Sequence, residues 1–182
     1  DPKINIKKVG ITGWSRGGMN STMISEKRLR DILISKDLYY AAALPRAVDC
    51  YGGGFFENPQ PIKETKTWMV NGEIDDVTLA KPCIGFVEKL KANGANIELT
   101  TKKGWGHGFE ANYEAEFEPQ AQVFNDCPPY YIRDDGTTNP DAVYSWDDPC
   151  IGKGNTIGGV VQGGKKSWVV FKKPVTKFFI EN

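Results

Sequence analysis

The sequence predicts an α/β protein in which a mostly parallel sheet is covered by helices on both faces. Short apolar, β-branched runs alternate with longer stretches in which apolar residues recur at helical spacing, and this alternation is typical of βαβ units. Glycines follow most of the short runs. Ligand sites in such sheets lie beyond the carboxyl ends of the strands, so the functional site is expected near these glycines.

The first strand is expected at Val9–Thr12, an apolar, β-branched run that ends at Gly13. The mixed polar and apolar stretch from Met19 to about Ser35 predicts a helix after it. A second strand is expected at Ala47–Tyr51, because three glycines close this run.

A third strand is expected at Thr67–Asn71, which Gly72 closes. Apolar residues recur at helical spacing over Leu79–Ala92, and the Asn-Gly pair that follows is a C-terminal stop signal for a helix. A fourth strand is expected at Ile97–Thr101, closed by Gly104.

The chain is expected to form a single domain over residues 1–182, although its regularity weakens beyond the fourth strand. Residues 112–164 are rich in Pro, Gly, Asn and Asp with little periodicity, so they are expected to form an irregular insertion or a lid-like segment. The apolar stretches Ser167–Phe171 and Val175–Ile180 predict a final helix that is interrupted or restarted at Pro174.

The composition argues against several classes of function. Of 182 residues, 23 are Lys or Arg and 23 are Asp or Glu, so the formal net charge is zero. A chain without a basic excess is not expected to bind nucleic acid or an anionic membrane. No apolar run approaches the roughly 18 residues that span a bilayer, so no membrane span is expected.

The cysteines leave two possibilities open. They show no C-x-x-C spacing and are accompanied by a single histidine, so no metal site is expected. Two disulfides in an oxidising compartment and four buried thiols in the cytosol both fit these counts. We slightly prefer disulfides, which favours a periplasmic or secreted location over a cytoplasmic one. The four residues are Cys50, Cys83, Cys127 and Cys150.

A G-x-S-x-G pattern occurs at Gly13-Trp14-Ser15-Arg16-Gly17. In a nucleophile elbow a serine lies on a strained turn between a strand and a helix, and the backbone N–H of the next residue points at a developing oxyanion. Ser15 is therefore the candidate nucleophile and Arg16 the candidate oxyanion donor. A glycine-rich turn with an incidental serine is the alternative.

His107 is the single histidine, and it follows the last expected strand among three glycines. A serine nucleophile needs a positioned base, which is usually imidazole. Asp75 and Asp76 follow the third strand, and one of them would orient the histidine. The order Ser15, acid, His107 is that of α/β-hydrolases and not that of the two common serine protease folds.

Two tryptophans flank this candidate site, Trp14 beside the serine and Trp105 beside the histidine. Both are expected to line an apolar substrate pocket, with core packing as the alternative for each. No cofactor is expected, because a serine, a base and an acid suffice for acyl transfer.

With these motifs the sequence resembles the dienelactone hydrolase family, and in particular its serine-containing, often exported relatives. The resemblance covers the chain to about residue 110. It implies an α/β-hydrolase fold with Ser15 as nucleophile, Asp75 as acid and His107 as base. Asp75 is preferred to Asp76 because the family places the acid three residues after the glycine that ends the strand. The matching segments are Asp1–Asn5 leading into Val9–Gly18, then Cys50–Gly53, Gly72–Cys83 and Gly104–Glu110.

The resemblance also carries departures. The members that name the family have a cysteine nucleophile, and the family fold has about eight strands, of which the strand before Ser15 resembles the fifth. The N-terminal strands, with the loop that supplies a second oxyanion donor, are therefore expected to be missing from this chain, which would be a fragment or one chain of an assembly. In such a fold the expected disulfides are Cys50–Cys83 and Cys127–Cys150.

The sequence thus predicts a serine hydrolase that cleaves a carboxylic ester or lactone through an acyl-enzyme. The expected partners are a small-molecule ester or lactone and a missing N-terminal segment or companion chain. The alternative is a non-catalytic binding or structural module on a hydrolase scaffold, and an acyltransferase with the same three side chains is also open.

Overall fold

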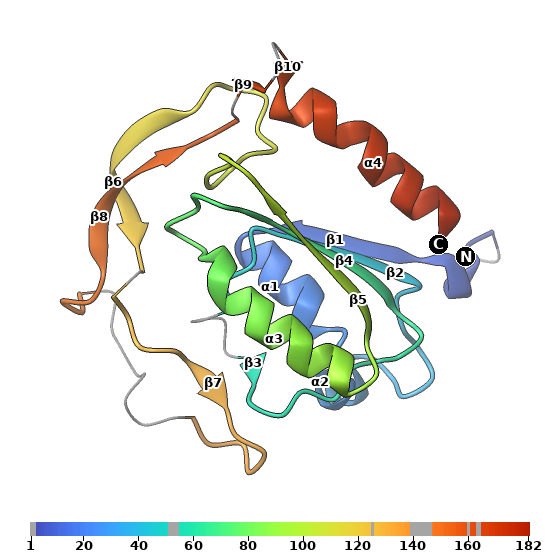
Figure 1. The fold of residues 1–182 in the computed structure, drawn as a ribbon. Coiled ribbons are helices and arrows are strands. Elements are labelled where there is room, and N and C mark those ends of the chain that lie inside the picture. Colours follow the sequence, from blue (N-terminus) through green and yellow to red (C-terminus); the bar gives the residue numbers. More distant parts are fainter. Residues whose placement is uncertain (1–2, 51–54, 125, 139–146, 160, 163–164) are drawn as a thin grey trace.

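The computed structural model describes residues 3–50, 55–124, 126–138, 147–159, 161–162 and 165–182. Its centre is a four-stranded parallel sheet in the order β1-β2-β4-β5 (Figure 1). The predicted parallel sheet is confirmed. Its strands are Gly10–Trp14 (β1), Ala42–Arg46 (β2), Lys66–Gly72 (β4) and Asn96–Lys102 (β5).

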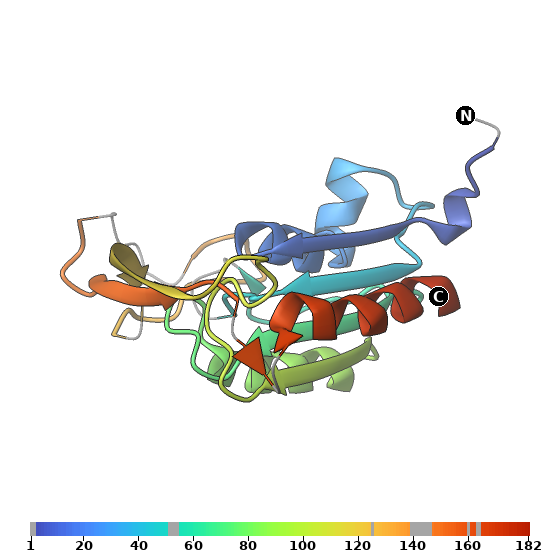
Figure 2. The same ribbon diagram turned by 90° about the horizontal axis from the view of Figure 1, so that it is seen from above.

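Helices cover both faces of this sheet, as predicted. Figure 2 shows α4 along one face, while α1 and α3 lie on the other. No helix of the described residues is both long and apolar enough to cross a membrane. The helices are η1 (Ile6–Lys8, a 3₁₀ turn), α1 (Arg16–Met23), α2 (Lys27–Leu33), α3 (Ala80–Ala92) and α4 (Ser167–Glu181).

The alternation of side chains along β4 explains why the sheet has a core on each face. Val70 packs with Phe171 of α4, whereas its neighbour Met69 packs with Val87 of α3. Both β4 residues are fully buried. A strand buried on both faces is typical of a sheet with helices on both sides.

The helix expected from Met19 to about Ser35 is two helices, α1 and α2. The chain between them turns at Glu26, which has an extended conformation and forms a bridge with Pro61. The Glu26 carboxylate accepts hydrogen bonds from the backbone of Arg28 at 3.4 Å and of Gln60 at 2.6 Å. This long-range contact starts α2 as a separate helix, and no local pattern announces it.

The second strand was expected in the wrong place. It lies at Ala42–Arg46, ahead of the expected Ala47–Tyr51, and Ala47 ends it with a φ of 47°. Pro45 argues against a strand interior because it cannot donate a ladder hydrogen bond. The structure nevertheless pairs Pro45 with Gly13 of β1. Residues 51–54 lie outside the described part.

The expected interruption of the last helix at Pro174 is also wrong. The helix α4 runs continuously from Ser167 to Glu181 with Pro174 inside it. Its inner side chains Phe171 and Phe178 are buried against the sheet on either side of the proline. Their burial offsets the single hydrogen bond that a proline removes from a helix.

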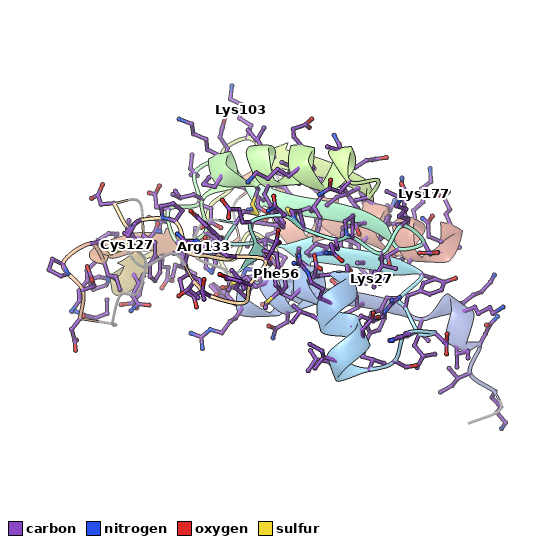
Figure 3. All side chains as sticks on the ribbon, turned by 90° about the horizontal axis from the view of Figure 1, so that it is seen from below. Lys27, Phe56, Lys103, Cys127, Arg133 and Lys177 are labelled. Atoms are coloured by element: carbon purple, nitrogen blue, oxygen red, sulfur yellow. A yellow bond between two sulfur atoms is a disulfide. The ribbon has the colours of Figure 1, made fainter. Side chains whose placement is uncertain are left out.

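Residues 112–164 are more regular than expected. Glu116–Val123 (β6) and Gly152–Ile157 (β8) form an antiparallel ribbon. The ribbon lies at the end of the molecule opposite the C-terminus (Figures 1 and 2), and Figure 3 likewise places Cys127 far from Lys177 of α4. Residues 139–146 lie outside the described part. The remaining short strands pair β3 (Phe55–Phe56) with β7 (Tyr131–Ile132) and β9 (Val161–Gln162) with β10 (Lys165–Lys166).

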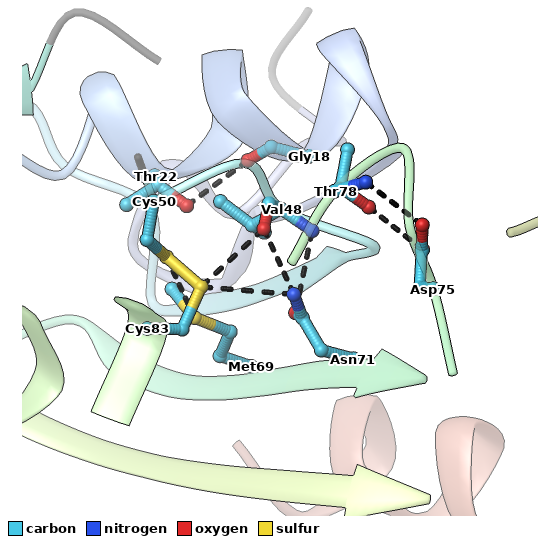
Figure 4. Close-up of a disulfide and its surroundings, with 9 residues drawn as sticks. All are labelled: Gly18, Thr22, Val48, Cys50, Met69, Asn71, Asp75, Thr78 and Cys83. Carbon is cyan, nitrogen blue, oxygen red and sulfur yellow. Dashed lines mark hydrogen bonds between the residues drawn. A yellow bond between two sulfur atoms is a disulfide. The ribbon is translucent and has the colours of Figure 1, made fainter. Parts of the chain in front are cut away.

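The structure contains the two disulfides that the resemblance led us to expect. Cys50 is bonded to Cys83 and Cys127 to Cys150. Figure 4 shows the first of them joining the chain after β2 to the first turn of α3. The second joins the segment that follows β6 to the one that precedes β8, and so links the two strands of the ribbon.

Candidate active site

Ser15 lies on a sharp turn between β1 and α1. Its φ of 53° and ψ of −118° are far from the usual conformations of a residue with a side chain. Its backbone N–H donates to the carbonyl of Arg46 at 2.9 Å, which ties the turn to β2. The strand, strained turn and helix expected around Ser15 are confirmed.

Two glycines make this turn possible. A Cβ on Gly13 would lie 2.1 Å from the carbonyl oxygen of Gly17, and one on Gly18 would lie 2.3 Å from that of Arg46. Gly17 itself has open space around it, because a Cβ there would have no neighbouring atom within 4 Å. The turn therefore requires Gly13, the first glycine of the motif, and Gly18, the glycine just after it.

The side chains of Asp75 and His107 are in contact. The Nδ1 atom of His107 lies 2.9 Å from Oδ2 and 3.1 Å from Oδ1 of Asp75. Both side chains are buried, so little water competes for this contact. An ionised carboxylate only accepts hydrogen bonds. The proton of the neutral imidazole is therefore on Nδ1, which leaves Nε2 as an acceptor.

Backbone and side-chain donors hold the Asp75 carboxylate in place. Oδ1 accepts from the backbone N–H groups of Val77 at 3.0 Å and Thr78 at 2.8 Å, and Oδ2 accepts from the Thr78 hydroxyl at 2.7 Å. Figure 4 shows the two bonds from Thr78. The neighbouring Asp76 is exposed. Of the two candidate acids, the structure brings Asp75 to the histidine.

The loops that carry the acid and the histidine are bonded to each other. Gly72 at the end of β4 has no room for a side chain, because a Cβ there would lie 2.1 Å from the carbonyl oxygen of Trp105. That same carbonyl accepts the backbone N–H of Ile74 at 3.1 Å. On its other side the histidine loop joins the ribbon, since Gly158 donates to the His107 carbonyl at 2.9 Å.

Ser15 and His107 lie at the carboxyl ends of strands of the same sheet, with Trp14 beside the imidazole. The rings of Trp14 and His107 are tilted against each other with centroids 4.9 Å apart. In the described part of the chain the Ser15 hydroxyl makes no hydrogen bond to His107. Such bonds are often long in unliganded sites and tighten when substrate binds. Trp14 is 38% exposed, so part of its side chain is open to solvent.

Trp105 does not line this site, contrary to expectation. It is 1% exposed and packs in the core with Phe109 and Phe171. The alternative weighed from the sequence, core packing, is the correct one. A tryptophan beside a candidate histidine gives no local sign of which side of the loop it occupies.

Three further residues beside the site were not anticipated from the sequence. Thr78 could have been noticed, because an aspartate three residues before a threonine often forms a local turn. Arg46 and Glu110 could not, because their contact joins the end of β2 to a loop far along the chain. The Nη1 atom of Arg46 lies 3.2 Å from Oε1 of Glu110, and burial raises the pKa of the Glu110 carboxyl although the charge of Arg46 opposes this. No group of three or more His, Cys, Asp or Glu side chains among the described residues could hold a metal ion.

The parallel sheet, the strained serine turn that opens α1, and the order of serine, acid and histidine give the chain part of the α/β-hydrolase fold. β1, which carries Ser15, is an edge strand among the described residues. The strands that would precede it in a complete fold are not present in the described part of the chain.

No protein-family model matches the chain, and neither does any curated protein. Among solved structures it is similar to esterase PE8, with 17% identity and a TM-score of 0.43 over 58% of this chain and 45% of that one. It is similar to MGS-M1, an α/β hydrolase enzyme from a Medee basin deep-sea metagenome library, with 18% identity and a TM-score of 0.46 over 60% and 44%. It is also similar to the PHB depolymerase from Penicillium funiculosum, with 17% identity and a TM-score of 0.44 over 62% and 43%. The chain thus spans less than half the length of each of these proteins.

Proposed function

We propose that this chain is the catalytic part of a serine hydrolase that cleaves a carboxylic ester or a lactone. The observation that carries the proposal is the buried hydrogen bond between His107 and Asp75 beside a serine on a strained turn. A bonded pair of this kind leaves Nε2 of the imidazole free to act as a base. The motifs shared with dienelactone hydrolases support ester or lactone substrates over amides.

In the proposed reaction Ser15 Oγ attacks the carbonyl carbon while its proton passes to Nε2 of His107. The tetrahedral intermediate collapses, and His107 returns the proton to the departing alkoxide, so that an acyl-enzyme and an alcohol result. Water then attacks the acyl carbon by the same route and releases the acid. Asp75 stays ionised and stabilises the imidazolium that forms in each half-reaction.

Arg16 and Trp14 take supporting roles in this proposal. Arg16 is the first residue of α1, where helix geometry directs backbone N–H groups out of the helix end. Its N–H would donate to the oxyanion, a contact whose loss typically costs about 10²–10³-fold in kcat. The exposed face of Trp14 would contact the apolar part of a small-molecule substrate. The ribbon of β6 and β8, bonded to the histidine loop, would border the substrate as a lid.

A further segment or companion chain is expected to complete the site. β1 pairs only with β2 in the described part, and it leaves an open edge directly beside Ser15. Val9, just before β1, is 36% exposed, and Ile6 is 61% exposed. An open strand edge that follows a segment with exposed apolar side chains favours pairing with another strand. A strand added there would bring its own backbone donors to the oxyanion.

The proposal is tested with a fluorophosphonate probe, which labels activated serines, followed by peptide mapping. Labelling at Ser15 is expected, and it should be lost in Ser15→Ala and in His107→Ala. The matched control is Ser35→Ala, which removes a serine from the segment after α2 and should leave labelling unchanged. A folded wild-type protein without labelling would contradict the proposal and would favour a non-catalytic module.

Product analysis separates the remaining alternatives. With p-nitrophenyl acetate and an added alcohol, a hydrolase releases acetate, whereas an acyltransferase produces the new ester. If a missing donor must complete the oxyanion hole, residues 1–182 alone should be labelled but turn over slowly, by roughly 10²–10³-fold in kcat relative to the completed enzyme.

A further inference from the structure

A partly buried ion pair lies beside the site and belongs to none of the proposed catalytic steps. Arg46 ends β2, beside the serine turn, and Glu110 lies three residues beyond His107 in the histidine loop. Their side chains, 17% and 12% exposed, meet at 3.2 Å. This charge contact joins the end of β2 to the histidine loop.

Each partner lies on a backbone segment that adjoins a proposed catalytic residue. The Arg46 carbonyl accepts the backbone N–H of Ser15, and the absence of a side chain at Gly18 lets the helix approach that same carbonyl. Glu110 is held by a turn in which Ala111 donates to the carbonyl of Gly108 at 2.8 Å. The side-chain contact between Arg46 and Glu110 therefore joins the backbone segments that carry the serine turn and the imidazole.

The pair is poorly suited to stabilise the fold. Among the described residues Nε of Arg46 and both carboxylate oxygens of Glu110 are buried without a hydrogen-bond partner, so the 3.2 Å contact is an ion pair without hydrogen-bond alignment. Buried charges with incomplete hydrogen bonding often cost more than they contribute. Ala47, next to Arg46, adds strain with a φ of 47° although it is not a glycine, and strain of this kind gathers at functional sites.

From these observations we infer that Arg46 and Glu110 form a positioning pair, which holds the Ser15 turn at a fixed distance from the His107 imidazole. This inference rests on the proposed function. Neither side chain is required to touch the substrate. The pair acts through the residues on either side of it, and its effect should appear in kcat and not in KM.

The test compares Glu110→Gln, Arg46→Met and the double variant Arg46→Met/Glu110→Gln. Each single variant breaks the contact, so the rate of Ser15 labelling should fall in both. Arg46→Met leaves the Glu110 carboxylate without its cation and should also lower the stability of the fold. The double variant removes both charges and should regain the melting temperature of the wild type. Its labelling rate and kcat should nevertheless stay roughly 10-fold below those of the wild type, with KM unchanged. Recovery of both stability and rate would mean that the pair is only structural, and the inference would be wrong.

Arg30→Met/Asp31→Asn is the matched control, since it removes a partly buried pair with a 2.6 Å contact on α2. It should change stability without changing the labelling rate.

A second readout does not depend on activity, because the single histidine gives one set of imidazole signals by ¹⁵N NMR. The double variant should shift or broaden the His107 signals, and the control should not. If wild-type Ser15 is never labelled, the proposed function fails and this spectrum alone decides the inference, with unchanged signals overturning it.

Discussion

Replacing Asp75 with asparagine should move the proton of the His107 imidazole from Nδ1 to Nε2. The structure fixes how the new amide would sit. Its oxygen takes the place of Oδ1, which accepts two backbone N–H groups at 3.0 and 2.8 Å. The amide nitrogen then occupies the Oδ2 position, 2.9 Å from Nδ1 of the imidazole. Two donors cannot face each other at this distance, so Nδ1 must become an acceptor.

The magnitude follows from this tautomer. With the proton on Nε2 the imidazole cannot accept the Ser15 proton, and the corresponding change in serine proteases lowers kcat by about 10⁴-fold. This is about 5 kcal/mol of transition-state stabilisation. The fold should survive, because the Thr78 hydroxyl at 2.7 Å can rotate and accept from the new amide.

Two measurements check the prediction. The rate of fluorophosphonate labelling should fall by about four orders of magnitude in Asp75→Asn, while ¹⁵N spectra of the single histidine should show the proton on the other ring nitrogen. Asp76→Asn changes the exposed neighbour in the same way and should leave both readouts as in the wild type. Labelling within tenfold of the wild type in folded Asp75→Asn, or an unchanged tautomer, would refute the role of the Asp75 contact.

Three further predictions concern stability. Gly13→Ala should destabilise the fold by at least about 1–3 kcal/mol, because its Cβ would meet the backbone of Gly17 at 2.1 Å. Gly17→Ala should be neutral or stabilise the fold by up to about 1 kcal/mol. Thermal unfolding of the two variants distinguishes these outcomes. Thr65→Val should stabilise by about 1–3 kcal/mol in urea unfolding, because the Thr65 hydroxyl is buried without a hydrogen-bond partner in the described part. Burial raises the pKa of the Glu110 carboxyl above its ordinary 4.5, so the folded state favours the protonated form. The protonated Glu110 therefore contributes stability below about pH 4.5, and this contribution is lost as the pH rises through the raised folded pKa. A glutamine side chain cannot ionise, so the stability of Glu110→Gln should improve relative to that of the wild type as the pH rises through this window. A difference in stability that does not change with pH would contradict the assignment.

The elements that the sequence predicted well are those with local signals. The turn at Ser15 follows from glycines around it, and α3 ends at Asn93 and Gly94 as the stop signal indicates. The second strand was predicted in the wrong place because Pro45 argues against a strand at its observed position. The separate helix α2 was not predicted because it starts at Glu26, which is bonded to the distant residue Gln60. In both cases a contact between segments far apart in the chain overrode the local pattern.

The sequence by itself determined the candidate chemistry: which serine is the candidate nucleophile, that His107 is the only imidazole in the chain, and in what order the candidate acid follows. Those facts are carried by residue type and by spacing within a few positions. The resemblance already favoured Asp75 over Asp76, but only the tertiary structure brings Asp75 into contact with the histidine, places Trp105 in the core, and pairs Arg46 with Glu110. These outcomes depend on how separate loops at the edge of one sheet pack together. The contacts that decide this packing are made by residues far apart in the sequence, so no local pattern predicts them.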